Sequence, residues 1–262
     1  MNTKKVEEYI IKWLISYKNR NNINGFVVGV SGGIDSAVTS TLCSKTGIKT
    51  LCIDIPIKQE LSQHSRAKNH INWLKKKFEC VDSNSIDLSK MLEEFEKIVH
   101  EEKTESLKKH ALANTRARLR MLTMYYFASL KKYIVVGTGN KVEDFGIGFF
   151  TKYGDGGVDI SPIADLTKSE VYKLAKHLKI DKRIIDANPT DGLWDDNRTD
   201  EQQIGATYDE IEWAMNQKMI GKISRDFNGR EKEIFDIFEN HHNNNKHKMT
   251  KIPICIIPPE LK

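Results

Sequence analysis

The sequence SGGIDS, residues 31–36, places two glycines, two hydroxyl side chains and one carboxylate next to one another. An apolar run at 26–30 precedes it and a helical pattern follows, which predicts a strand that turns into a helix. Backbone N–H groups and a helix start at such a turn attract anions. The glycines let the backbone approach a ligand, and the serines add hydroxyl donors. We therefore predict a phosphate-binding site here and call residues 31–36 the phosphate loop.

Asp35 is the residue of the phosphate loop that needs a partner. The loop lacks the Gly-Lys-Ser/Thr ending of a Walker A motif, so it carries no lysine of its own. A carboxylate beside phosphates is repulsive unless a cation bridges them, which makes Asp35 a candidate Mg²⁺ ligand. The alternative is a tight turn in which Asp35 is only a helix-start charge favoured by the macrodipole.

A second polar segment, GTGNKVE at 137–143, follows the apolar run 133–136. Thr138 and Glu143 would then lie just beyond the carboxyl end of a strand, which is where open α/β sheets bind their ligands. The segment predicts a second contribution to the same site.

Residues 144–158 are rich in glycine and aromatic side chains and show no clear periodicity. This composition predicts a long ordered loop, and loops of this length often have a function. Lys152 and Asp155 lie in it, where a lysine can meet a developing charge and the glycines can let the loop close over a substrate. A rigid surface turn is the alternative.

Basic residues occupy two predicted helices. Lys168 lies in the first turn of a helix that opens with the capping-box pattern TKSE. A cation there is mildly unfavourable, and a bound anion would reverse the sign; a solvated lysine is the alternative. Arg116, Arg118 and Arg120 alternate along another helix, so at most one or two of them can reach one phosphate. They can also be ordinary surface charges.

Apolar periodicity predicts four strands separated by helices. Such an order gives a parallel sheet with helical crossovers, an α/β fold. The strands are expected at 26–30, 49–55, 78–81 and 133–136, and the helices at 6–17, 34–46, 59–77, 87–100, 105–131 and 168–178. Later segments are mostly helical, including one that follows the capping-box pattern TYDE at 207–210. We expect one domain, 1–262, with a core at about 24–190 and a helical extension at about 191–262.

Two segments near the C-terminus differ in composition. Residues 241–251 are polar, so we expect them to be mobile without ligand and their three histidines to be solvated. Residues 252–259 are apolar enough to pack back onto the core.

Composition narrows the class of protein. The chain has 262 residues, 39% of them hydrophobic and 29% charged, which fits a folded globular protein. Its net charge of +5 is spread over many lysines; this favours anionic ligands, and we do not expect nucleic acid as a partner. The four cysteines form no metal or redox spacing, and no run suits a signal peptide or a membrane span. We expect a cytoplasmic protein.

The motifs together resemble a known family. The phosphate loop is similar to the PP-loop of ATP pyrophosphatases, which release pyrophosphate from ATP. The segments 137–143 and 150–157 resemble the central block of ammonia-dependent NAD synthetases, with NTRARLR at 114–120 and NPTDGLWDD at 188–196 in the family's order. The resemblance covers about 25–208 and implies a Rossmann-like open parallel sheet flanked by helices, of the adenine nucleotide alpha hydrolase type.

The resemblance also implies the site residues. It implies that ATP contacts Gly29, Val30, Ser31, Gly32, Gly33, Ile34, Asp35, Ser36, Thr138, Lys168 and Thr190, with Asp35 and Glu143 on Mg²⁺. It implies that deamido-NAD contacts Arg118, Lys152, Asp159, His247 and Lys248, although the residues after Lys248 are less basic than the family's usual pattern. Asp35, Glu143 and Lys168 are the expected catalytic groups.

The implied reaction is ATP-dependent amidation of deamido-NAD by ammonia through an adenylate, which gives NAD, AMP and pyrophosphate. Because the core begins near residue 25, no N-terminal glutaminase is expected, and a homodimer is the implied assembly. Two alternatives stay open: a PP-loop ligase or thiolase that modifies tRNA, which an added RNA-binding domain would favour, and a nucleotide-binding regulator without chemistry.

Overall fold

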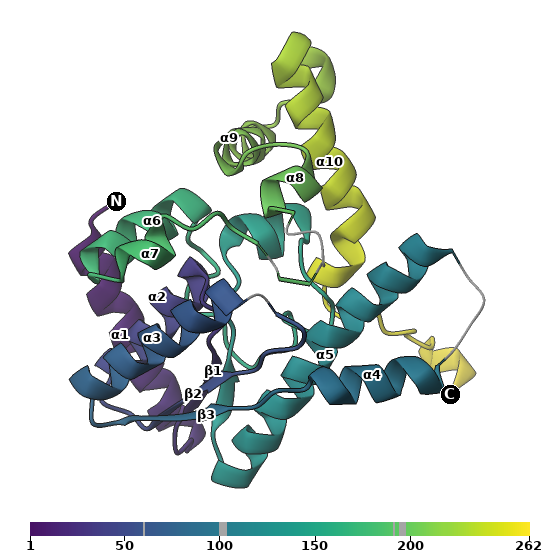
Figure 1. Cartoon of the computed structure of the whole chain (residues 1–262). Coiled ribbons are helices and arrows are strands. Elements are labelled where there is room, and N and C mark those ends of the chain that lie inside the picture. Colours follow the sequence, from purple (N-terminus) through teal and green to yellow (C-terminus); the bar gives the residue numbers. More distant parts are fainter. Residues whose placement is uncertain (60, 100–103, 191, 194–197) are drawn as a thin grey trace.

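A parallel sheet of four strands forms the centre of the chain, with the strand order β3-β2-β1-β4 (Figure 1). This is a computed structural model, and it describes residues 1–59, 61–99, 104–190, 192–193 and 198–262. The strands are β1 Phe26–Gly29, β2 Thr50–Asp54, β3 Val81–Ser85 and β4 Ile134–Val136. Phe26 of β1 pairs with Thr50 on one side and with Ile134 on the other. The expected α/β fold with an open parallel sheet is confirmed.

Helices cover both faces of the sheet because the side chains of β1 alternate. Phe26 and Val28 face a core formed with helices α1, α2 and α6, whereas Val27 faces a core formed with α4 and α5. The helices of this part are α1 Thr3–Asn21, α2 Ile34–Lys45, α3 Leu61–Lys77, α4 Ser89–Ile98, α5 Glu105–Lys131, α6 Lys168–His177 and α7 Lys182–Ile185. Two apolar layers therefore hold the strands between helices.

The later helices form a separate core beside the sheet. Its elements are the π-helical turn η1 Val142–Ile147, the helices α8 Asp200–Ile204, α9 Tyr208–Met219 and α10 Gly229–Met249, and the short 3₁₀ turn η2 Ser224–Asp226. Buried side chains from η1, α8, α9 and α10 pack together, with Phe235 and Phe238 among them. Figure 1 shows α9 and α10 projecting away from the sheet. Since η1 follows β4 closely, this second core is attached beside the carboxyl ends of the strands.

Two expectations about local structure need correction. The third strand is Val81–Ser85 and not 78–81, because Phe78 still donates its N–H to Leu74 O at the end of α3. Because the sequence of this edge strand is polar, a search for apolar runs did not identify it. Residues 144–158 are not a loop throughout, because η1 includes their start.

The structure also differs from two expectations about segments near the C-terminus. Residues 241–249 belong to α10, where His241 and His242 contact the carbonyl oxygens of Ile204 and Gly146. These contacts stabilise a helix in a segment whose side chains are mostly polar. Residues 251–262 are exposed, so the apolar segment 252–259 does not pack back on the core. It ends in the 3₁₀ turn η3 Pro259–Leu261.

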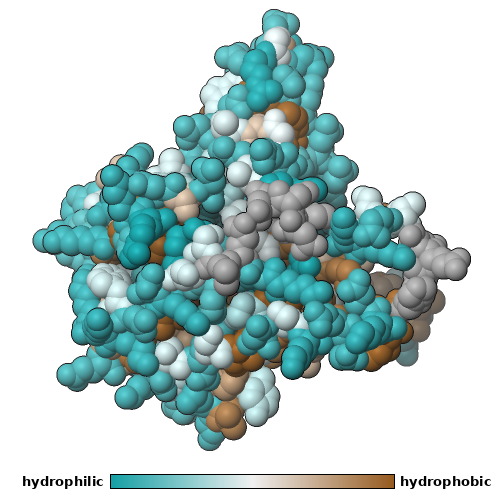
Figure 2. All heavy atoms as spheres, in the orientation of Figure 1, coloured by the Kyte–Doolittle hydropathy of each residue, from teal (hydrophilic) through white to brown (hydrophobic). Residues whose placement is uncertain are grey.

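The surface in Figure 2 is mostly hydrophilic, with apolar side chains in small groups. Within the described parts of the chain, no helix combines the length and the apolar character needed to cross a bilayer.

Candidate functional site

A cavity of about 250 Å³ opens at the carboxyl ends of the central strands. It lies where the strand order reverses between β1 and β4, the position at which open α/β sheets bind ligands. Every residue of the phosphate loop lines it, as do Gly29, Val30, Thr138, Glu143, Lys168 and Thr190. The structure thus brings all the residues expected to contact ATP into one cavity.

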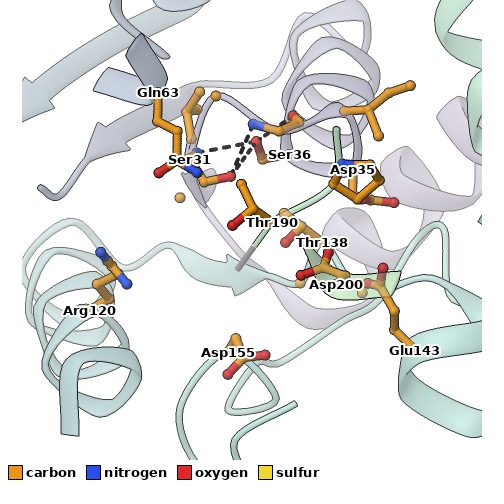
Figure 3. A pocket seen from close by; sticks show the side chains of 18 of the residues that line it. Ser31, Asp35, Ser36, Gln63, Arg120, Thr138, Glu143, Asp155, Thr190 and Asp200 are labelled. Atoms are coloured by element: carbon orange, nitrogen blue, oxygen red, sulfur yellow. Dashed lines mark hydrogen bonds between the residues drawn. The ribbon is translucent and has the colours of Figure 1, made fainter. Parts of the chain in front are cut away.

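Short-range hydrogen bonds hold the phosphate loop. Ser36 Oγ donates to Gly33 O at 2.9 Å and accepts from the Ser31 N–H at 3.2 Å, contacts visible in Figure 3. Gly32 has φ +84°, and a Cβ there would lie 2.4 Å from Gln63 O, so no side chain fits. The loop leads directly into α2, whose first N–H groups provide an anion site.

Opposite charges meet beside the loop in a group that we call the ion-pair cluster: Asp35, Glu143 and Lys168. Lys168 Nζ lies 2.7 Å from Asp35 Oδ2 and 2.9 Å from Glu143 Oε1. Asn140 Nδ2 donates to the other oxygen of Asp35 at 3.1 Å. Lys168 was expected to be an unfavourable helix-start cation awaiting an anion. The structure instead gives it two carboxylate partners from this chain, and its side chain is only 4% exposed.

Burial and charge act in opposite directions on these three groups. Burial alone would raise the pKa of Glu143, but the charge of Lys168 and the hydrogen bond from Tyr208 outweigh it, so the pKa is lowered. Burial is the largest influence on Asp35 and raises its pKa, against the charge of Lys168. Burial would lower the pKa of Lys168, but the two carboxylates raise it. Lys168 therefore keeps its positive charge at neutral pH.

Tyr208 of the second core contacts the ion-pair cluster and Asp200 contacts Tyr208, and the sequence did not single out either residue. The Tyr208 hydroxyl lies 2.5 Å from Glu143 Oε1 and 3.3 Å from Asp200 Oδ2. Asp200 also lines the cavity, on the same side as Asp35 and Glu143 in Figure 3. Only the capping-box pattern around Tyr208 was visible in the sequence, and that pattern reports a helix start and no function.

The arginines of α5 divide by helical spacing. Arg116 and Arg120 are four residues apart and share a face. Arg116 is buried and donates to Leu193 O, while Arg120 Nε donates to Ile55 O at 3.0 Å and lines the cavity. Arg118 points elsewhere and donates to Lys152 O at 3.3 Å. Arg120 was therefore a missed residue of the site, because the burial of its face of α5 is visible only in the structure.

The five residues expected to contact deamido-NAD do not line this cavity. Four of them lie near one another: besides the Arg118 contact, Lys152 Nζ donates to His247 O at 2.7 Å, and Lys248 Nζ donates to Phe150 O at 2.9 Å. Asp159 lies beside β4, where its carboxylate accepts from the Val135 N–H at 2.7 Å. The C-terminal end of α10 is thus tied to the glycine-rich loop.

The cavity has the oxygen donors that a magnesium nucleotide needs. Among the described residues, five carboxyl groups and three basic side chains line it: Asp35, Glu143, Asp144, Asp155 and Asp200, and Arg66, Arg120 and Lys168. The described residues contain no group of three metal-binding side chains. Mg²⁺ commonly binds through one or two carboxylates together with substrate phosphates, so this donor set fits an ion that arrives with ATP.

Comparison with known proteins assigns the chain to a family. The family model described as NAD synthase matches residues 6–252. The chain belongs to the NAD synthase family. An NH(3)-dependent NAD(+) synthetase of Carboxydothermus hydrogenoformans is 38% identical over 216 residues, 81% of this chain and 85% of that protein. Another, from Mycoplasmopsis pulmonis, is 36% identical over 100% of this chain and 96% of its own length.

A solved structure of a protein with a different name is also similar to this member of the NAD synthase family. It is an NMN synthetase from Francisella tularensis, with a TM-score of 0.83 and 31% identity, and the match covers 99% of both chains. The NPTDGLWDD motif at 188–196 lies partly outside the described residues, and its described members at the cavity are Asn188, Pro189, Thr190 and Leu193.

Proposed function

We propose that this chain is an ATP-dependent ligase that amidates deamido-NAD with ammonia and forms NAD, AMP and pyrophosphate. The observation that carries the proposal is the ion-pair cluster beside the phosphate loop, in one cavity of a chain from the NAD synthase family. Relatives named NH(3)-dependent NAD(+) synthetases match most or all of its length.

The reaction consists of two displacements. The nicotinate carboxylate of deamido-NAD attacks the α-phosphorus of ATP, and the bond to pyrophosphate breaks. Ammonia then attacks the carboxyl carbon of this adenylate, AMP leaves with its bonding electrons, and the nitrogen loses a proton. The phosphate loop would bind the pyrophosphate part of ATP through its N–H groups, and Lys168 would stabilise the developing negative charge. Neither step needs a side-chain nucleophile.

Asp35 and Glu143 would hold Mg²⁺ together with the phosphates of ATP. The ion would supply positive charge that offsets the charge of pyrophosphate as it leaves. Lys168 lies between these carboxylates, so the chain can keep their charge compensated by a group of its own.

The remaining assignments belong to the same proposal. Arg118, Lys152, Asp159, His247 and Lys248 would bind deamido-NAD. The supporting contact is the one between Lys152 and His247, because it brings the loop and α10 together. We also propose a homodimer, and one domain over 1–262 with its core at about 24–190 and a helical extension at about 191–262.

The similarity to the Francisella tularensis NMN synthetase favours a second candidate substrate. NMN lacks the AMP half of NAD, so the corresponding amidation would act on nicotinate mononucleotide. The same phosphate loop and ion-pair cluster would serve that reaction, because the attacked phosphate belongs to ATP in both cases.

One assay tests both candidates. Purified protein is given ATP, Mg²⁺ and ammonium, with deamido-NAD, with nicotinate mononucleotide or with neither, and pyrophosphate, NAD and NMN are measured. We expect pyrophosphate release and NAD formation that both require deamido-NAD. Release that requires the mononucleotide and gives NMN would transfer the proposal to the second candidate. ATP binding without turnover on either substrate would overturn it and favour the regulator.

A further inference from the structure

Glu143 differs from its two partners in what holds its backbone. Asp35 and Lys168 lie in the first turns of α2 and α6, which pack against the sheet. Glu143 lies in η1, and its neighbours Val142 and Ile147 are buried in the second core with residues of α9 and α10. The position of Glu143 relative to the other two therefore depends on how the second core is attached.

Tyr208 provides that attachment at the carboxylate itself. Its side chain is buried, and its hydroxyl lies 2.5 Å from the Glu143 oxygen that Lys168 also contacts. The Tyr208 hydroxyl has one hydrogen to donate. Because Glu143 is closer than Asp200, which is 3.3 Å away, the hydroxyl donates this hydrogen to Glu143. Two donors thus fix one oxygen of Glu143.

The ring of Tyr208 also contacts the ion-pair cluster. Lys168 Nζ lies 4.7 Å from the ring centroid, so the aromatic face attracts the ammonium group. One turn later on the same face of α9, Glu212 accepts from the Ser169 N–H and from the Ser169 hydroxyl, each at 2.8 Å. Ser169 follows Lys168 at the start of α6. Helix α9 therefore contacts both Glu143 and the helix start that carries Lys168.

We infer that Tyr208 is a positioning residue that fixes the Glu143 carboxylate against Lys168 and so couples the second core to the reaction centre. The inference rests on the proposed function. Tyr208 does not line the cavity, so it acts through the side chains that it contacts, chiefly Glu143 and Lys168. Without the Tyr208 hydroxyl, Glu143 keeps Lys168 as a partner but loses the donor that holds the orientation of its carboxylate.

The test uses Tyr208→Phe, which keeps the ring and removes only the hydroxyl. The matched control is Tyr17→Phe, because Tyr17 is half-buried beside Trp13 in α1, far from the cavity. We expect kcat of Tyr208→Phe to fall by about 10- to 100-fold, the usual effect of losing a hydrogen bond to a charged group, with KM for deamido-NAD within about twofold. Tyr17→Phe should match the wild type.

A double-mutant cycle with Glu143→Gln gives a second measurement that does not need turnover. Thermal midpoints are recorded for the wild type, the two single variants and the double variant. If the hydroxyl acts through Glu143, the decreases are smaller in combination than their sum. Additive decreases, or a Tyr208→Phe enzyme with unchanged kcat, would overturn the inference. If the wild type turns over neither substrate, the proposed function is refuted. The thermal midpoints of the cycle then still test whether Tyr208 is coupled to Glu143.

Discussion

The phosphate loop and the ion-pair cluster lie in the same cavity but are built in different ways. The turn of the loop is held by hydrogen bonds between residues at most five positions apart, such as those of Ser31 and Ser36, and the side chains of Gln59 and Arg66 add contacts to the carbonyl oxygens of Ser31 and Gly32. The cluster joins Asp35, Glu143 and Lys168, so its contacts span up to 133 positions of the chain. The turn that forms an anion site can therefore be encoded mainly by neighbours in sequence, whereas a compensated group of charges requires the complete fold.

The largest effect should come from removing the cation of the cluster. Lys168→Met leaves Asp35 and Glu143 buried without their shared partner, and breaking a buried ion pair in this way costs about 3–5 kcal/mol. Chemical denaturation would measure this loss of unfolding free energy. The control Lys141→Met breaks a 2.9 Å pair with Asp165, whose side chain is 97% exposed, and should cost at most about 1 kcal/mol. Equal losses would remove the distinction between the cluster and a surface pair.

A smaller effect is expected from a side chain in the phosphate loop. Gly32→Ala places a Cβ against Gln63 O and forces alanine to φ +84°, so we expect about 3 kcal/mol of destabilisation together with weaker ATP binding. Gly47→Ala is the control, because Gly47 has φ +72° and nothing within 4 Å of its added Cβ. It should lose about 1 kcal/mol and keep its ATP affinity. Calorimetry with ATP separates the two; loss of affinity in both variants would mean that the local packing of the loop is not decisive.

The smallest effect is a dependence of stability on pH at the helix behind the loop. Burial lowers the pKa of His70 to about 4, and its ring contacts Ser40 Oγ of α2 at 3.1 Å. The unfolded chain takes up this proton near pH 6.5, so between these values it binds more protons than the folded state. Stability then falls as the pH falls from about 6.5 towards 4, by about 2 kcal/mol at pH 5. Thermal midpoints of His70→Gln should fall less steeply over this range than those of the wild type, and parallel curves would contradict the assignment.

The sequence predicted the parts of the fold that have strong local signals. The apolar strands β1, β2 and β4, the phosphate loop and the long helix α5 all lie where periodicity and turn residues placed them. The capping box at Thr207 predicted the start of α9 correctly, and Glu210 makes the expected contact with the Thr207 N–H at 2.9 Å. These features depend on neighbours in sequence.

The features that could not be predicted from the sequence depend on contacts between distant segments. The strand β3 is polar and is identified by its pairing with β2. The end of α10 contains asparagines and histidines, which are weak helix formers, but Asn245 and Lys248 donate to carbonyl oxygens about one hundred positions away. Tyr208 and Arg120 gain their roles only when α9 and α5 meet the cavity. No local pattern could identify such residues.

The attachment of Glu143 to the second core also predicts how the protein fails when heated. Helices α8 to α10 have their own apolar cluster, so they can open as a cooperative unit while the sheet stays folded. Each such opening would carry η1 and Glu143 away from Lys168. Heat inactivation should thus begin below the temperature at which the sheet unfolds, and amides of α9 should exchange with solvent before those of β1.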